Sequence, residues 1–157
     1  MTMRKQFRAP WDLKLIVITS GVIILFGGLN YAMPNLWSAL LLWSIVLGSA
    51  AFGVYGYSIQ EGKLKILRLG WSKDINLSDI DKVEEKPNAM LGSLRSFGIG
   101  GLFGYIGHFS NSILGRYKAY ATHTKQTVVI YVNKEQIVIS PDDPKEFVTT
   151  LREAIKQ

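Results

Sequence analysis

The sequence predicts a membrane-anchored α+β protein, in which two transmembrane helices precede a curved antiparallel β-sheet or sandwich and one C-terminal helix. Three observations predict this architecture. Residues 15–60 contain no Asp, Glu, Lys, Arg or His. Alternating apolar residues, typical of half-buried strands, follow between residues 64 and 140. The last apolar residues then recur at helical spacing, and strands followed by a helix favour an α+β arrangement.

The uncharged stretch is too long for one membrane span and has the length of two. A helix rises about 1.5 Å per residue, so about 20 residues cross a hydrocarbon core of about 30 Å. The predicted spans are 13–32 and 36–57, separated by a Met-Pro-Asn turn at 33–35. With the short basic segment before them they form one unit, residues 1–57, and residues 58–157 form a second.

A cleaved signal peptide is the alternative interpretation of the first span, because a basic start precedes an apolar run. That run is near 20 residues rather than 7–15, no small-x-small cleavage site follows it, and a second apolar span comes next. We therefore expect the first span to be retained.

Small residues such as Gly21 and Gly28 share one face of the first span. They either let the two helices approach closely or are simply tolerated in lipid.

Basic residues flank both outer ends of the two spans, whereas the turn between the spans carries no charge. These residues are Arg4, Lys5, Arg8 and Lys14 before the first span, and Lys63, Lys65 and Arg68 after the second. Cytoplasmic flanks of membrane helices carry an excess of Lys and Arg. We therefore expect an inner (cytoplasmic) membrane protein with both termini in the cytoplasm.

Composition limits the second unit to one small domain of about 100 residues. The chain has no cysteine, which excludes disulfides, zinc–thiolate sites and thiol chemistry. The net charge of +6 divides into +3 before residue 15 (four Lys/Arg, one Asp) and +3 after residue 57 (fourteen Lys/Arg, eleven Asp/Glu). So small a surplus argues against a nucleic-acid partner and suits a domain beside an anionic leaflet.

The second unit is expected to contain several strands and one helix. The predicted strands cover about residues 64–69, 71–76, 77–84, 116–123, 127–132 and 136–140, the last three as an antiparallel meander. The helix has clear boundaries, because Asp143 can act as N-cap, Pro144 occupies the first helical position and Glu146 can close a capping box. Its apolar face would carry Phe147 and Leu151.

Residues 89–115 form an unusual segment, with seven glycines and one formal charge among 27 residues. Four aromatics lie within it: Phe97, Phe103, Tyr105 and Phe109. We predict a flexible loop whose aromatics either pack on the sandwich or rest among lipid headgroups. It is not a P-loop, because no Gly-Lys-Ser/Thr follows, and Phe103 stands where a dinucleotide fingerprint needs glycine. No cofactor is expected.

No catalytic or metal-binding constellation is present in the sequence. The only histidines, His108 and His123, have no carboxylates or further imidazoles converging with them. Ser110 lies near His108, but no acid is placed to orient that histidine as in a nucleophilic dyad. We therefore expect neither a metal site nor an enzyme.

Three segments resemble bacterial pleckstrin-homology-like (PH-like) domains that follow one or two membrane helices: Gly-Ile-Gly-Gly-Leu-Phe-Gly-Tyr-Ile-Gly at 98–107, Tyr-Ala-Thr at 120–122 and Ile-Ser-Pro-Asp-Asp-Pro-Lys-Glu-Phe at 139–147. The resemblance covers about residues 57–157. It implies a seven-stranded, strongly bent antiparallel β-sandwich closed by the C-terminal helix, and little about activity. Lys63, Lys65 and Arg68 depart from the Lys-x(n)-Lys/Arg-x-Arg signature of lipid-binding PH domains, which argues against specific phosphoinositide recognition.

Two functions remain as hypotheses. In the first, the PH-like domain is an interaction or scaffolding module that binds a protein partner in the membrane or at its cytoplasmic face. In the alternative, it recognises anionic lipid headgroups. The candidate membrane or headgroup contacts are Lys63, Lys65, Arg68, Arg95, Phe97, Phe103, Tyr105, Phe109, Arg116 and Lys118.

Overall fold

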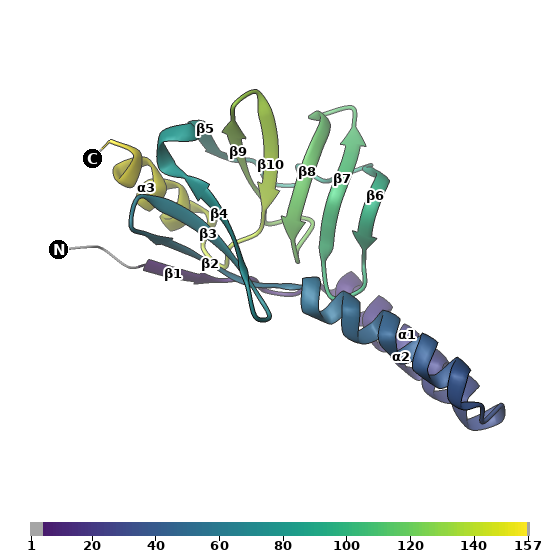
Figure 1. Cartoon of the computed structure of the whole chain (residues 1–157). Coiled ribbons are helices and arrows are strands. Elements are labelled where there is room, and N and C mark those ends of the chain that lie inside the picture. The colour runs from purple at the N-terminus through teal and green to yellow at the C-terminus, as the bar shows by residue number, and fades with distance from the viewer. Residues whose placement is uncertain (1–4, 157) are drawn as a thin grey trace.

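The computed structural model describes residues 5–156, so Arg4 of the predicted basic flank lies outside the described residues. A β-sandwich with a C-terminal helix carries a pair of helices that projects from one end (Figure 1). The elements are β1 (Lys5–Arg8), α1 (Leu13–Ala32), α2 (Leu36–Phe52), β2 (Val54–Gln60), β3 (Lys63–Arg68), β4 (Ser72–Asn76), the 3-10 turn η1 (Leu77–Asp79), β5 (Ile80–Glu85), β6 (Leu94–Gly100), β7 (Tyr105–Asn111), β8 (Gly115–Ala121), β9 (Val128–Val132), β10 (Glu135–Ile139) and α3 (Pro144–Ile155).

The strands form two sheets, in the orders β1-β2-β3-β4 and β5-β9-β10-β8-β7-β6. Neighbouring strands are antiparallel except β8 and β10, which are parallel. The predicted antiparallel meander of the last three strands is therefore wrong, because β10 lies between β8 and β9. Ser140, which follows β10, accepts hydrogen bonds from the N–H groups of Thr122 and His123 at 2.8 and 3.1 Å. The chain leaving β8 thus crosses the end of β10 before it returns as β9.

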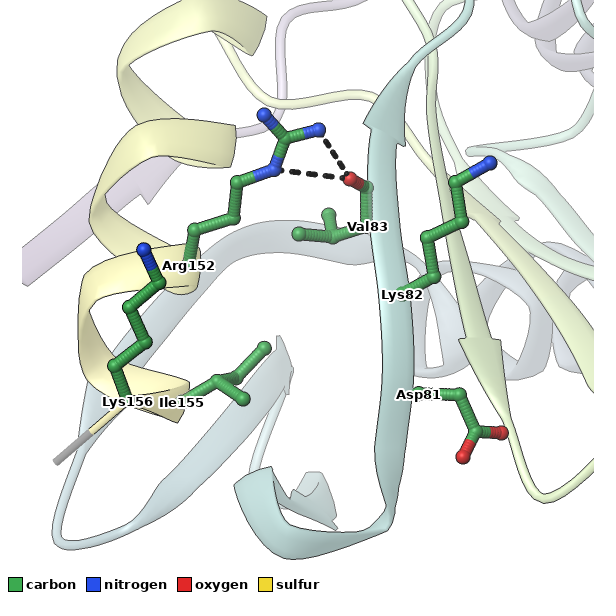
Figure 2. Close-up of a pocket in the computed structure, with 6 residues that line it drawn as sticks. All are labelled: Asp81, Lys82, Val83, Arg152, Ile155 and Lys156. Carbon is green, nitrogen blue, oxygen red and sulfur yellow. Dashed lines mark hydrogen bonds between the residues drawn. The ribbon is translucent and has the colours of Figure 1, made fainter.

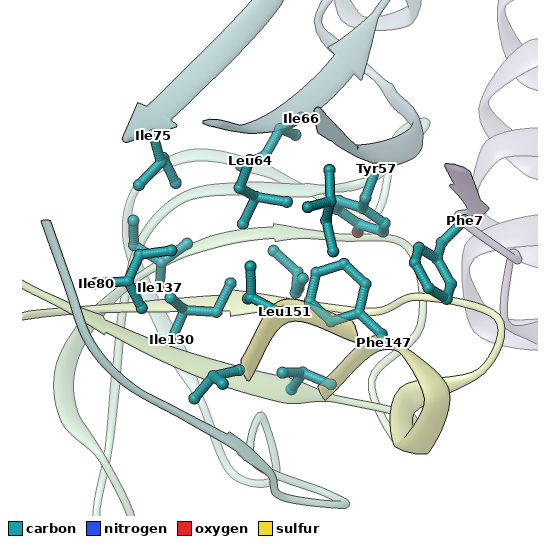
Figure 3. Packing of buried hydrophobic residues seen from close by; sticks show 14 of the residues in the cluster. Phe7, Tyr57, Leu64, Ile66, Ile75, Ile80, Ile130, Ile137, Phe147 and Leu151 are labelled. Atoms are coloured by element: carbon teal, nitrogen blue, oxygen red, sulfur yellow. The ribbon is translucent and has the colours of Figure 1, made fainter. Parts of the chain in front are cut away.

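The main core lies between the two sheets and is closed by α3 (Figure 3). Phe147 of α3 contacts Phe7 of β1 and Tyr57 of β2, with ring centroids 5.0 and 6.1 Å apart. The predicted N-cap of this helix is confirmed, because the Asp143 carboxylate accepts the Glu146 N–H at 2.9 Å and Pro144 is the first helical residue. The predicted capping box is wrong, because the Asp143 N–H donates to Asp142 and the Glu146 carboxylate pairs with Lys5. A second cluster, with Met90, Phe109, Tyr117 and Val129, covers the outer face of the six-stranded sheet.

The predicted first unit, residues 1–57, differs from the prediction near both of its ends. The basic segment contains a strand, β1, which pairs antiparallel with β2 and places Phe7 in the core. The second helix was predicted to reach residue 57 but ends at Phe52, because Val54 and Tyr57 are buried in the sandwich as part of β2. The predicted unit boundary between residues 57 and 58 therefore falls inside β2.

The glycine-rich segment is a β-hairpin, so the prediction of an irregular loop over residues 89–115 is wrong. Gly98 of β6 and Gly107 of β7 are directly opposite, with φ of +113° and +131°. A Cβ at Gly98 would overlap the Ile106 carbonyl oxygen, and one at Gly107 would overlap that of Phe97. Glycine is needed at these two positions because the two backbones approach closely.

Candidate functional site at the helix base

The helix pair exposes apolar side chains on all sides. Within α1 and α2 only Leu15, Thr19 and Val46 are buried. Large residues along both helices are mostly exposed, such as Leu13 at 75% and Trp37 at 79%. Helix α1 is long and apolar enough to cross a membrane, and α2 is a shorter apolar helix of 17 residues. Exposed apolar surface of this extent marks a contact with lipid or with another protein.

Asp12 joins the start of α1 to the six-stranded sheet. Its carboxylate caps the helix by accepting the Leu15 N–H at 2.7 Å. The same carboxylate accepts the N–H and the hydroxyl of Thr124, at 3.0 and 2.9 Å, and the Tyr105 hydroxyl at 3.3 Å. The Asp12 N–H donates to the Thr122 carbonyl at 3.0 Å. The helix therefore begins from a carboxylate that the sandwich holds in place.

The charges of this site follow from its hydrogen bonds. Burial alone would raise the pKa of Asp12, but the hydrogen bonds from Leu15 and Thr124 outweigh burial and lower it. Burial, together with the adjacent Asp12 charge, raises the pKa of Tyr105 to about 12. At neutral pH Asp12 is therefore an anion and Tyr105 a neutral hydrogen-bond donor.

A second contact joins α1 to the β6–β7 turn, residues 101–104. In Figure 1 this end of the hairpin meets the end of the helix pair that is nearest the sandwich. The Thr19 hydroxyl donates to the Gly101 carbonyl at 3.3 Å and accepts the Phe103 N–H at 3.2 Å. A Cβ at Gly101 would lie 3.0 Å from Ile18 Cδ1, so the turn lies directly on the helix. The Phe103 ring packs edge-on against Trp11, with centroids 5.8 Å apart.

The β3–β4 turn touches the end of α2. Trp71 packs edge-on against Phe52, with ring centroids 5.3 Å apart, and the Arg68 guanidinium lies 6.0 Å from the Phe52 ring centre. Two turns from different sheets therefore contact the helix base. We use this term for residues 11–19, which lead into and begin α1, and residues 52–53, at the end of α2.

The four aromatics predicted for one membrane-facing loop have different surroundings. Phe109 is buried beside Tyr117, with nearly parallel rings 6.0 Å apart. Phe103 and Tyr105 are half-buried against the helix base. Phe97 is 76% exposed, on β6 at the edge of its sheet. Three of the four aromatics thus pack on protein, which was the first of the two predicted alternatives. The fourth, Phe97, is accessible to a membrane or a partner.

The basic residues that were predicted to contact the membrane also have different surroundings. Lys63 lies 3.9 Å from Asp74, Lys65 lies 3.8 Å from Glu61, and Lys118 pairs with Glu135 at 2.7 Å. Arg95 and Arg116 are exposed. Arg68 is half-buried with its guanidinium 5.1 Å from the Tyr120 ring centre, and its Nε has no hydrogen-bond partner among the described residues.

Several of these cations point to the same side of the molecule. Arg68 and Lys73 of the four-stranded sheet both approach the Tyr120 ring of the six-stranded sheet. His108, Arg116 and Lys118 share the face of Tyr120 by strand alternation and register. We call Arg68, Lys73, His108, Arg116 and Lys118 the basic face.

Sequence reasoning missed Lys73 and His108 as members of the basic face. The alternation of β4 could have placed Lys73 beside the buried Ile75, two residues away on the same face. A hydrogen bond from Lys118 and its positive charge lower the pKa of Glu135, and Lys73 and His108 add to this effect. The geometry agrees, because Lys118 pairs with Glu135, His108 is directly opposite Lys118, and Lys73 lies over the neighbouring Tyr120 ring.

A pocket of about 220 Å³ lies between α3 and β5 (Figure 2), lined by Asp81, Lys82, Val83, Arg152, Ile155 and Lys156. Arg152 donates two hydrogen bonds to the Val83 carbonyl, at 3.3 and 2.8 Å, which ties the helix to the strand.

His123 also has a structural role, because its Nδ1 accepts the N–H groups of Lys125 and Gln126. Within residues 5–156, no group of three His, Asp or Glu side chains gathers as a metal site.

Comparison with known proteins identifies the sandwich. No curated protein and no solved structure matches the chain. A family model described as bacterial PH domain matches residues 55–155, from the start of β2 to the end of α3. Strand β1 lies outside the match although it completes the four-stranded sheet. Because the match covers well over half of the residues, the chain belongs to the bacterial PH domain family.

Proposed function

We propose that this protein is an integral membrane protein that presents its PH domain at the cytoplasmic surface of the inner membrane, as an interaction module for a protein partner. The exposed apolar helix pair carries this proposal. At about 1.5 Å per residue, α1 is about 30 Å long and α2 about 26 Å, close to the thickness of a hydrocarbon core. Membership of the PH family supports an interaction or lipid-binding module.

The way the helices connect to the sandwich supports an orientation in which the sandwich lies on the cytoplasmic side of the membrane. Strand β1 enters the helix pair and β2 leaves it, and the two strands are hydrogen-bonded neighbours in one sheet. Both ends of the pair therefore lie on the same side of a membrane, with Asn35 at the far end. Lys5 and Arg8 before the helices, and Lys14 in the first turn of α1, favour the cytoplasm for the sandwich side.

Strand β6 is the surface best suited to a protein partner. It is the last strand of its sheet, and six of its seven residues are exposed, including Leu94 and Phe97. An edge strand presents unpaired backbone donors and acceptors to which a partner can add a strand, and exposed side chains add specificity. The proposal includes no catalytic role.

Cysteine labelling tests the orientation, because the chain has no native cysteine. Asn35→Cys should react with a membrane-impermeant maleimide only from the periplasmic side, and Asn133→Cys in the β9–β10 turn only from the cytoplasmic side. Labelling of residue 35 from the cytoplasm alone would contradict the transmembrane orientation.

Crosslinking in the native membrane tests the partner surface. A photo-crosslinking residue at Phe97 of β6 should yield a discrete protein adduct, whereas one at Asp81, exposed on the opposite edge strand β5, should not. Equal adducts from both sites would contradict β6 as the partner surface.

Recognition of anionic headgroups is the second candidate function, and the basic face supports it. Arg68, Lys73 and Arg116 have no carboxylate within 4 Å among residues 5–156, whereas Lys63 and Lys65 do. The test uses the full chain in nanodiscs of phosphatidylglycerol or phosphatidylcholine. The double variant Arg68→Gln/Arg116→Gln should lose bound phosphatidylglycerol in native mass spectrometry, and Lys63→Gln/Lys65→Gln should retain it. Equal retention by both variants would contradict this candidate.

A further inference from the structure

We infer that the β6–β7 turn, residues 101–104, is immersed in the membrane beside α1 rather than lying above the headgroups. This inference rests on the membrane anchoring proposed above and specifies a lipid contact of the PH domain itself. Figure 1 shows the β6–β7 end of the sheet meeting the end of the helix pair that is nearest the sandwich. Three features of that contact support immersion: its depth along α1, the pairing of its polar groups, and the position of the neighbouring aromatic and basic side chains.

The depth of the turn in the membrane follows from the position of Thr19 in α1. Thr19 is the seventh residue of α1, so it lies about 9 Å beyond the helix start. A hydrocarbon core of about 30 Å needs nearly the whole length of both helices. If lipid began only beyond Thr19, residues 20–32 would cover about 20 Å, which is too short. The turn contacts Ile18 and Thr19 and therefore lies within the lipid-covered part of α1.

Four of the backbone polar groups in the turn are paired within the protein. The Gly101 N–H donates to the Gly104 carbonyl at 2.9 Å, the Gly101 carbonyl accepts from Thr19, and the Phe103 N–H donates to Thr19. Thr19 is only 3% exposed. An unpaired polar group in hydrocarbon costs several kcal/mol, so each of these pairs lowers the cost of immersion. No Asp, Glu, Lys or Arg lies between Arg95 and Arg116.

The surrounding side chains mark the level of the headgroups. Trp11 packs against Phe103 just before the helix start, and Trp71 packs against Phe52 at the end of α2. Aromatic side chains of this kind concentrate at the membrane–water interface. Lys14, in the first turn of α1, is exposed and long enough to reach the headgroups. The Phe103 ring therefore lies at this level, whereas its backbone N–H and Gly101 reach Thr19 and Ile18 further along α1.

Nitroxide labelling of the full chain in phosphatidylglycerol nanodiscs tests this inference. Single-cysteine variants place the label at Leu102, at Ile24 in the middle of α1, and at Asn133 in the distant β9–β10 turn. The label at 102 should resemble that at 24, accessible to oxygen and protected from a water-soluble nickel chelate, and 133 should show the reverse. If 24 is protected while 102 is open to nickel, immersion is wrong but anchoring stands. If 24 is also open to nickel, the proposed anchoring fails.

Thr19 variants test the polar pairing independently. Thr19→Val keeps the side-chain shape but removes the hydroxyl, so the label at 102 should lose its protection from nickel. Thr19→Ser retains the hydroxyl and should keep that protection. Unchanged protection in Thr19→Val would overturn the conclusion that the hydroxyl holds the turn in lipid.

Discussion

Truncation of Asp12 should destabilise the attachment of the helices to the sandwich. Loss of an N-cap costs about 1 kcal/mol, and hydrogen bonds to a charged group contribute about 1.5–3 kcal/mol each. Asp12→Ala removes the cap to Leu15 and both bonds from Thr124. Water can replace part of these bonds, so we expect a loss of about 3–5 kcal/mol rather than their sum. That is a large share of a typical total of about 5–15 kcal/mol.

Urea unfolding of the full chain in nanodiscs, followed by tryptophan fluorescence, measures this loss. Trp11 packs at the helix base and should report it directly. Asp81→Ala is the matched control, because Asp81 is exposed on β5 and has no ion pair or side-chain hydrogen bond among the described contacts. The lowered pKa of Asp12 adds a pH dependence: its contribution is present above the unfolded value of about 3.9 and is lost below it. A change within about 0.5 kcal/mol, like that of the control, would refute this reasoning.

Three further substitutions or deletions have defined outcomes. Tyr57→Phe leaves the Tyr120 carbonyl and the Ser140 N–H without their partner, and should cost about 1–3 kcal/mol in the same unfolding assay. Burial raises the pKa of Tyr57 to about 12, so wild-type stability should fall between about pH 10 and about pH 12, and a variant with the same fall would contradict this assignment. Deleting α3 removes buried Phe147 and Leu151, each typically contributing about 2–5 kcal/mol, so cooperative unfolding should disappear; a transition at unchanged urea concentration would show that α3 does not close the core. Gly107→Ala should lower the urea midpoint more than Gly62→Ala, because Gly62 has a milder φ of +68° and no atom within 4 Å of an added Cβ; equal effects would contradict the close-approach argument.

Elements with local signals were predictable from the sequence. Helix α3 has its cap, its first-position proline and its apolar face within fifteen residues, and the structure confirms all three. The apolar length of α1 and the turn at Asn35 are similarly local, and helix α1 begins and ends at the predicted residues. Each of these features depends on neighbours along the chain rather than on distant residues.

Features that depend on distant partners were not predictable. Residues 5–8 form a strand only because β2 pairs with them some 50 residues later. The glycines of β6 and β7 suggest flexibility in sequence, yet their role depends on two strands facing each other. The second helix ends early because Val54 and Tyr57 gain more contacts in the sandwich core than a longer helix would give them. The basic face combines two sheets, so strand spacing alone could not assemble it.

The pairing of β1 with β2 has a mechanical consequence. Both strands connect to the helix pair at the same end, one entering it and the other leaving it. A force that pulls the helices away from the sandwich therefore draws β1 and β2 in the same direction, and the hydrogen bonds between them carry no shear. The load falls instead on the contacts of Asp12 with Thr122 and Thr124, on the β2–β3 ladder and on the contact of Phe7 with Phe147. A force that pulls the helices away from the sandwich would thus be resisted in part by the β2–β3 ladder, which is loaded in shear.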